Sequence, residues 1–189
     1  MKRLLAALAI AALVGCASVN KIESGDQNIG GRMSVHLEGA WNHVSAPGMG
    51  PAQTWTMEGL PVDQLLIYSG LRDGEAVHAG GGGAAKSFSF RSTMQPDEVV
   101  TMFEGMLTRD GSSFKLAKLE PISFGGERGF RFEYALTRKE DNVVLSGVGY
   151  GTVNKGELFA LLYFAPRLTF FDRHRGRVEQ IARSARVKG

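Results

Sequence analysis

The sequence is short of several residue types, and each shortage excludes a class of protein. Cys16 is the only cysteine among 189 residues, which excludes an internal disulfide and a zinc site built on several thiolates. Hydrophobic residues make up 43% and charged residues 22% of the chain, so it is neither collagen-like nor wholly disordered. The longest apolar run is too short to cross a bilayer, which takes about 20 residues. The length suits one domain with a core of useful size.

That apolar run stands at the start of the chain and has the pattern of a secretory signal peptide. Lys2 and Arg3 precede an unbroken apolar segment, residues 4–14. A positive start, a short apolar region and small residues after it are typical of a segment that is removed on export. The alternative is a buried N-terminal helix, but no capping residue precedes the run.

The end of the run, Leu13, Val14, Gly15 and Cys16, resembles the lipobox of bacterial lipoproteins. The resemblance implies that the Cys16 thiol receives a diacylglyceryl group, that residues 1–15 are then removed, and that the new amino terminus is acylated. Two or three acyl chains hold a protein stably at a membrane, whereas one chain binds only marginally. The alternatives are an ordinary buried cysteine or a secretory cleavage nearby, after Ala17.

The residue after the cysteine bears on the location. In many Gram-negative bacteria an aspartate there keeps a lipoprotein in the inner membrane, and this chain has Ala17 instead. The resemblance therefore implies an exported protein, anchored in the outer membrane and facing the periplasm if the host is Gram-negative. Membrane lipid, through acylated Cys16, is the first expected partner, and an envelope protein is the second. Nucleic acid is not expected, because the chain is exported and its net charge is only +3.

The remaining chain divides into two parts. Residues 16–32 are polar and contain three glycines, which predicts a lipidated N-terminus followed by a flexible tether. Residues 33–189 are expected to form a single globular domain. Within it, alternating or apolar patterns predict strands over residues 33–37, 53–57, 65–68 and 86–91.

The second half of the domain has the clearest pattern. Pro96 followed by Asp97 and Glu98 predicts a helix start, and apolar residues at helical spacing continue it to about residue 107. Strands follow over residues 115–119, 129–137, 143–153 and 157–164, and a last helix over residues 168–186. The strand connections are too short for parallel crossovers. The predicted fold class is therefore α+β, an antiparallel sheet with two main helices packed on it.

This order of elements resembles the Mog1/PsbP-like α/β/α sandwich, in which an antiparallel sheet carries a central helix and a long C-terminal helix. The resemblance covers roughly residues 30–187. It rests on the element order and on the texture F-x-F-x-Y … L-x-Y-F-A-P between Phe130 and Pro166, without a signature motif. Because such folds serve many roles, the resemblance does not predict a function.

No pattern predicts a catalytic residue, a cofactor or a metal site. Residues 80–87 (GGGGAAKS) nearly match a phosphate-binding loop, but Ala85 replaces its second glycine and the alternation after Lys86 predicts a strand where that loop needs a helix. Nucleophile motifs are absent, and the acids Glu58, Glu133 and Asp172 are scattered as surface charges would be. None of the histidines has metal-binding spacing, and the last is expected in the core; they are His36, His43, His78 and His174.

Two features bear on binding. Residues 167–188 carry seven basic side chains against two acidic ones. Arg173, Arg177, Arg183 and Arg186 form a candidate basic surface for anionic head groups or an acidic partner, the alternative being an ordinary solvated helix face.

The second feature is a pair of tryptophans. Trp41 and Trp55 flank a loop rich in proline and glycine, residues 45–51, and are a candidate ligand mouth. Packing of both rings in the core is the alternative.

The sequence therefore predicts a membrane-anchored envelope lipoprotein that serves as a non-catalytic binding or assembly module. The alternative is an anchored enzyme or small-ligand binder that acts on envelope glycan or lipid.

Overall fold

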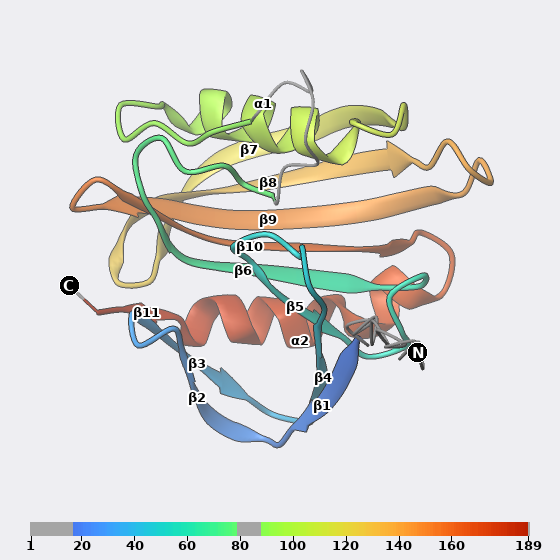
Figure 1. Cartoon of the computed structure of the whole chain (residues 1–189), viewed down its shortest axis with the longest axis horizontal. Helices are drawn as coiled ribbons and strands as arrows, with labels where there is room; N and C mark the ends of the chain where they lie inside the picture. Colours follow the sequence, from blue (N-terminus) through green and yellow to red (C-terminus); the bar gives the residue numbers. More distant parts are fainter. Residues whose placement is uncertain (1–16, 79–87, 189) are drawn as a thin grey trace, which may run out of the picture.

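The computed structural model describes residues 17–78 and 88–188. It has the predicted α+β architecture, with one helix on each face of a large antiparallel sheet (Figure 1). The strands of this sheet follow one another in the order β1 (Ser18–Ile22), β4 (Trp41–Ser45), β5 (Gln53–Thr56), β6 (Gln64–Leu71), β10 (Glu157–Pro166), β9 (Val144–Asn154), β8 (Glu127–Thr137) and β7 (Ser113–Phe124).

A smaller sheet lies on the α2 side of the large one (Figure 1). It has the order β11 (Arg186–Val187), β3 (Met33–Leu37) and β2 (Gly25–Ile29), with antiparallel pairing throughout. Helix α2 (Phe170–Ser184) contacts both β3 and the strands β9 and β10. The helix is therefore covered on two sides, by the large sheet and by the smaller one.

Helix α1 (Pro96–Leu107) begins where the sequence predicts. Pro96 occupies the first turn, and the carboxylate of Glu98 accepts a hydrogen bond from the Gln95 N–H at 2.7 Å, which satisfies a donor that the helix itself leaves free. Val99 and Phe103 are buried against the sheet. On the same face, the predicted alternation of β8 is confirmed, because its buried side chains are Phe130, Phe132, Tyr134 and Leu136.

Helix α2 buries the predicted stripe on the opposite face, including Phe171, Val178 and Ile181. It is shorter than the predicted helix over residues 168–186, because the chain leaves the helix to form β11. Arg186 pairs there with Ser34 of β3, and Val187 pairs with Met33. Backbone pairing with the small sheet thus replaces the last helical turn.

The structure differs from the sequence prediction at the N-terminal end of the domain. A tether was predicted over residues 16–32, but β1 pairs with β4 and β2 pairs with β3 within this segment. Both strands are held by backbone pairing. Few of their side chains enter the core, so most of these side chains can be polar. Ile29 is the exception and is buried. Strand β4 was also not predicted, and Cys16 and the rest of the lipobox lie outside the described residues.

The predicted strand over residues 86–91 is reduced in the described part to an isolated bridge between Ser89 and Ala76. The near-match to a phosphate-binding loop, residues 80–87, lies outside the described residues. In the part of the chain that is described, no helix has both the length and the apolar character of a membrane span.

Candidate binding surfaces and a cavity

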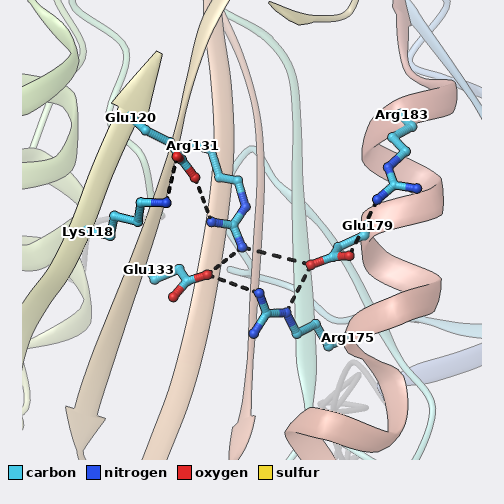
Figure 2. A network of polar contacts seen from close by, with 7 residues as sticks. All are labelled: Lys118, Glu120, Arg131, Glu133, Arg175, Glu179 and Arg183. Atoms are coloured by element: carbon cyan, nitrogen blue, oxygen red, sulfur yellow. Dashed lines mark hydrogen bonds and ion pairs between the residues drawn. The ribbon is translucent and has the colours of Figure 1, made fainter. Parts of the chain in front are cut away.

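Helix α2 is joined to the sheet by a network of alternating charges (Figure 2). Arg131 on β8 is only 13% exposed, and its guanidinium contacts Glu133 at 2.5 Å and Glu120 at 3.0 Å. Arg175 on α2 reaches the same Glu133 oxygen at 3.1 Å and contacts Glu179 at 2.9 Å. Each arginine thus has carboxylates from two elements, which ties one side of α2 to β8.

In this network the negative charges of the carboxylates are compensated by arginine and lysine side chains of the same chain. The Arg131 hydrogen bond holds the pKa of Glu133 below its usual value, and the Lys118 ammonium at 2.7 Å does the same for the pKa of Glu120. These carboxylates therefore stay ionised well into the acidic range. Arg131 and Arg175 each already pair with two carboxylates of the protein, which makes them poorer sites for an external anion than an unpaired arginine.

A second contact fixes the beginning of α2. The turn between β5 and β6 is held by the buried Asp63 carboxylate, which accepts hydrogen bonds from the Glu58 N–H at 2.8 Å and from the Met57 N–H at 3.0 Å. This places Glu58 Oε1 at 2.8 Å from His174 Nε2 and at 3.1 Å from Arg173 Nη1. The hydrogen bonds, first from His174 and then from Arg173, lower the pKa of Glu58.

His174 is therefore the core histidine that the sequence predicts. It is 5% exposed and packs on the apolar side of α2, with one ring nitrogen against Glu58. Glu58 and Glu133 belong to two separate ion-pair groups, and Asp172 is exposed. Residues 17–78 and 88–188 contain no group of three or more His, Cys, Asp or Glu side chains placed to hold a metal ion.

The four arginines of the candidate basic surface are all exposed. Arg173 pairs with Glu58, and Arg183 lies 3.7 Å from Glu179. Arg177 donates to the Met57 sulfur at 3.4 Å, and Arg186 donates to the backbone carbonyl of Ala185 at 2.6 Å and to that of Arg183 at 3.1 Å. Within the described part of the chain, Arg177 and Arg186 thus have no carboxylate partner.

An exposed apolar side chain stands at the start of this surface. Leu168 is 82% exposed and follows Arg167 in the connection from β10 to α2. The next residue, Thr169, has a φ of 81° and forms the centre of a tight turn, in which the Phe170 N–H donates to the Leu168 carbonyl at 3.1 Å. Arg173 lies over the Phe170 ring at 5.2 Å from its centroid. Apolar and cationic groups therefore stand together at this end of α2.

The candidate ligand mouth at Trp41 and Trp55 is corrected by the structure. The two residues are 2% and 1% exposed and belong to the core on the α2 face. The Trp41 ring meets Tyr163 edge-on at 6.4 Å, and Trp55 donates to the Gln53 side chain at 3.3 Å. Large aromatic rings bury more apolar surface in the core than they would at a loop. Core packing, the alternative left open by the sequence, is what the structure shows.

The loop between β4 and β5 does border a cavity, on the face that carries α1. The cavity has a volume of about 220 Å³ and lies between this loop, strands β5 and β6, and the end of α1. Met49 of the loop, Leu66 of β6 and Met106 of α1 provide apolar walls, and His78 and Arg109 provide polar groups.

The polar groups of this cavity differ in their hydrogen bonding. The Tyr68 hydroxyl donates to the Val77 carbonyl at 2.9 Å and lies 3.3 Å from the Met106 sulfur, and burial raises the pKa of Tyr68. Both ring nitrogens of His78 are buried, and no group in the described part of the chain forms a hydrogen bond with them. In the sequence His78 lacks metal-binding spacing, and no spacing rule connects it with Arg109.

Comparison with known proteins identifies the fold. No family model matches the chain, and no curated protein matches it. Among solved structures, it is similar to the solution structure of cyanobacterial PsbP (CyanoP) from Synechocystis sp. PCC 6803, with a TM-score of 0.58 and 16% identity over 96% of this chain and 99% of that one. At this identity the likeness concerns the fold alone. It supports the PsbP-like arrangement expected from the order of elements.

Proposed function

We propose that the protein is a lipid-anchored, non-catalytic binding module of the bacterial cell envelope. The lipobox at residues 13–16 supports the anchor. The observation that carries the binding role is the exposed basic surface, where Arg177 of α2 and Arg186 of β11 have no carboxylate partner in the described part of the chain. Exposed cations held on fixed elements of the fold attract an anionic surface and orient it. We assign the partner to the class of acidic envelope proteins.

The short distance between lipid and domain adds to this proposal. Only Ala17 separates Cys16 from β1, which begins at Ser18. Because an extended residue spans about 3.5 Å, the first strand would start within about 7 Å of the lipidated residue. The domain would therefore work close to the membrane surface, where a partner must also be a membrane protein or lie against the membrane.

The anchor is tested by the variant Cys16→Ala. We expect it to stay unprocessed or soluble and to take up no lipid label, whereas the control Ser18→Ala keeps the cysteine and is processed normally. Membrane fractionation and metabolic labelling with a fatty acid measure both. If Cys16→Ala fractionated with membranes and carried the same label as the wild type, the anchor would be disproved.

The binding role is tested by charge reversal at two arginines of the basic surface, one on α2 and one on β11. A photo-crosslinking group near Arg177 should join the wild type to an acidic envelope protein, and Arg177→Glu combined with Arg186→Glu should remove that product. Arg128→Glu, at an exposed position at the start of β8, is the matched control and should leave the product unchanged. An unchanged product after this charge reversal would contradict the proposal. Binding of the wild type to anionic vesicles alone would reassign the surface to lipid.

The cavity near His78 favours a second function, that of a small-ligand binder. This cavity is independent of α2, because its lining residues Leu66, Tyr68 and Met106 belong to the core on the α1 face of the sheet. Calorimetry with a panel of small acids, amines and neutral compounds would test this function. Heat of binding from none of them would contradict it.

A further inference from the structure

The cavity between the β4–β5 loop and the end of α1 is lined by His78, whose ring nitrogens have no hydrogen-bond partner among the described residues. A neutral imidazole carries one N–H donor and one acceptor nitrogen, and a protonated one carries two donors. Within residues 17–78 and 88–188, neither nitrogen of His78 reaches a partner, although both are shielded from solvent. Buried polar atoms in native proteins are nearly always hydrogen-bonded, because an unpaired one loses its hydration without compensation. Among the described residues, the imidazole of His78 therefore keeps hydrogen-bonding capacity that a ligand in this cavity can use.

Arg109 supplies a charge to the same cavity. It follows the α1 C-cap, Thr108, and its side chain is exposed. Within residues 17–78 and 88–188, no carboxylate pairs with Arg109, whereas the guanidinium groups of Arg32, Arg131 and Arg138 each hold one. An unpaired guanidinium beside an unpaired imidazole favours an anion, and the planar fork of arginine suits a carboxylate.

The remaining walls limit the size and character of the ligand. Leu66, Met49 and Val77 line the cavity with apolar surface, and the Tyr68 hydroxyl is already bound to a backbone carbonyl. A volume of about 220 Å³ is smaller than the roughly 300–1,000 Å³ of pockets for drug-sized ligands. Such a space suits a small molecule with an anionic head and a short apolar chain. Inorganic phosphate has no apolar part to place against these walls.

We propose that this cavity binds a small aliphatic carboxylate. The Arg109 guanidinium and an N–H of His78 donate to the carboxylate, and the aliphatic chain lies against Leu66 and Met49. This proposal rests on the second function proposed above, that of a small-ligand binder, and names its ligand class. The site is independent of the lipid anchor and of the basic surface, so a failure of butyrate binding would leave those two proposals standing. The thioethers of Met49 and Met106 are ligands for soft metal ions, but an unpaired arginine at the same cavity disfavours a cation.

The experiment is a titration of the ¹⁵N-labelled full-length protein with sodium butyrate, followed by NMR. We expect saturable shifts of the amide signals of residues around the cavity, among them His78 and Arg109, with a dissociation constant on the order of 1 mM or tighter. Butylamine, which has the same chain and the opposite charge, should produce no saturable shift.

Two variants test the assigned contacts. Arg109→Gln should weaken butyrate binding by about tenfold or more, because a charge-assisted hydrogen bond is lost. Its side chain is exposed, so the fold is not at risk, and Arg128→Gln is the matched control that should bind like the wild type. His78→Leu removes both nitrogens at similar bulk and should weaken binding to a similar extent.

Three outcomes would overturn the proposal. The first is the absence of saturation up to about 50 mM butyrate, which would assign the cavity to ordered water. The second is that butylamine binds as tightly as butyrate, which would show that the cavity does not distinguish an anion from a cation. The third is that Arg109→Gln binds butyrate with the affinity of the wild type. This variant tests the proposal even if His78→Leu fails to fold.

Discussion

Phe132 of β8 lies directly opposite Gly149 of β9, and its ring occupies the space that a side chain at Gly149 would need. A Cβ built on Gly149 would stand 2.2 Å from ring atoms of Phe132. The same relationship holds for Tyr134 with Gly147 and for Phe130 with Gly151. The three glycines of β9 thus let a row of aromatic rings lie flat on the sheet beneath α1.

This relationship predicts that Gly149→Ala destabilises the protein. The new methyl group overlaps a ring that is itself packed against Phe103, so we expect a loss of about 1–3 kcal/mol in the free energy of unfolding. Urea denaturation followed by circular dichroism measures it. Gly176→Ala is the control, because that glycine lies within α2 with open space around it, and we expect a gain of about 0.5–1 kcal/mol. Equal effects at the two positions would refute the packing argument.

The charge network predicts that Glu133→Gln loosens α2. Arg131 is 13% exposed and would lose one of its carboxylates, and Arg175 would lose its link to β8. Allowing for the partial exposure of Glu133, we expect a loss of about 1–2 kcal/mol. Hydrogen exchange of the α2 amides and thermal unfolding measure the effect. Glu140→Gln, at an exposed turn position, should change the stability by less than about 0.5 kcal/mol; a similar change in both variants would contradict the role of the network.

The pH dependence of stability follows from the same carboxylates. The pKa values of Glu133 and Glu58 are lowered in the folded protein from 4.5. Their stabilising effect is therefore complete above about pH 4.5 and is lost as the pH falls through the lower, folded-state values. We expect the free energy of unfolding to decline in this acidic window. In Glu133→Gln the decline should be shallower, and an identical slope in variant and wild type would disprove the assignment. Denaturant titrations at a series of pH values provide the measurement.

The turn before α2 predicts a stabilising substitution. Thr169 has a φ of 81°, a conformation that a β-branched residue adopts only with strain of about 1–3 kcal/mol. Thr169→Gly relieves that strain but frees the unfolded chain, so we expect a net gain of about 1 kcal/mol. Thr108→Gly at the α1 C-cap, where φ is −100°, is the control and should destabilise. Differential scanning calorimetry compares the two, and a loss of stability in Thr169→Gly would contradict the prediction.

The elements that bury one face were predictable, and those at the edges were not. The alternation of aromatic residues in β8 and the helical stripes of α1 and α2 each follow from one buried side, so the sequence pattern is strong. Strands β1 and β2 are held mainly by backbone pairing. Because this pairing does not require buried side chains, their sequences are mostly polar. No periodic pattern records such pairing, and these residues therefore resembled a tether.

For the candidate surfaces too, the sequence pattern predicts which residues are exposed, whereas their partners depend on the tertiary structure. Arg173, Arg177, Arg183 and Arg186 were predictable as an exposed set, because the apolar stripe of α2 fixes which side faces solvent. Which of these arginines carry a carboxylate partner depends on Glu58 of a distant turn and on Glu179. For the tryptophans beside the β4–β5 loop, the sequence favours core packing over a ligand mouth, and only the tertiary structure shows which of the two occurs.

The sequence by itself determined the apolar and polar sides of the main elements, and through the lipobox it predicts where the protein resides. Local spacing is enough for these properties, since each depends on neighbours along the chain. The tertiary structure alone decided that Met49, His78 and Arg109 border one cavity, because they come from three segments that meet only when the sheet has formed. It also decided that Arg175 of α2 pairs with Glu133 and Glu179, whereas Arg177 of α2 and Arg186 of β11 have no carboxylate partner among the described residues, since charge pairing depends on distance in space.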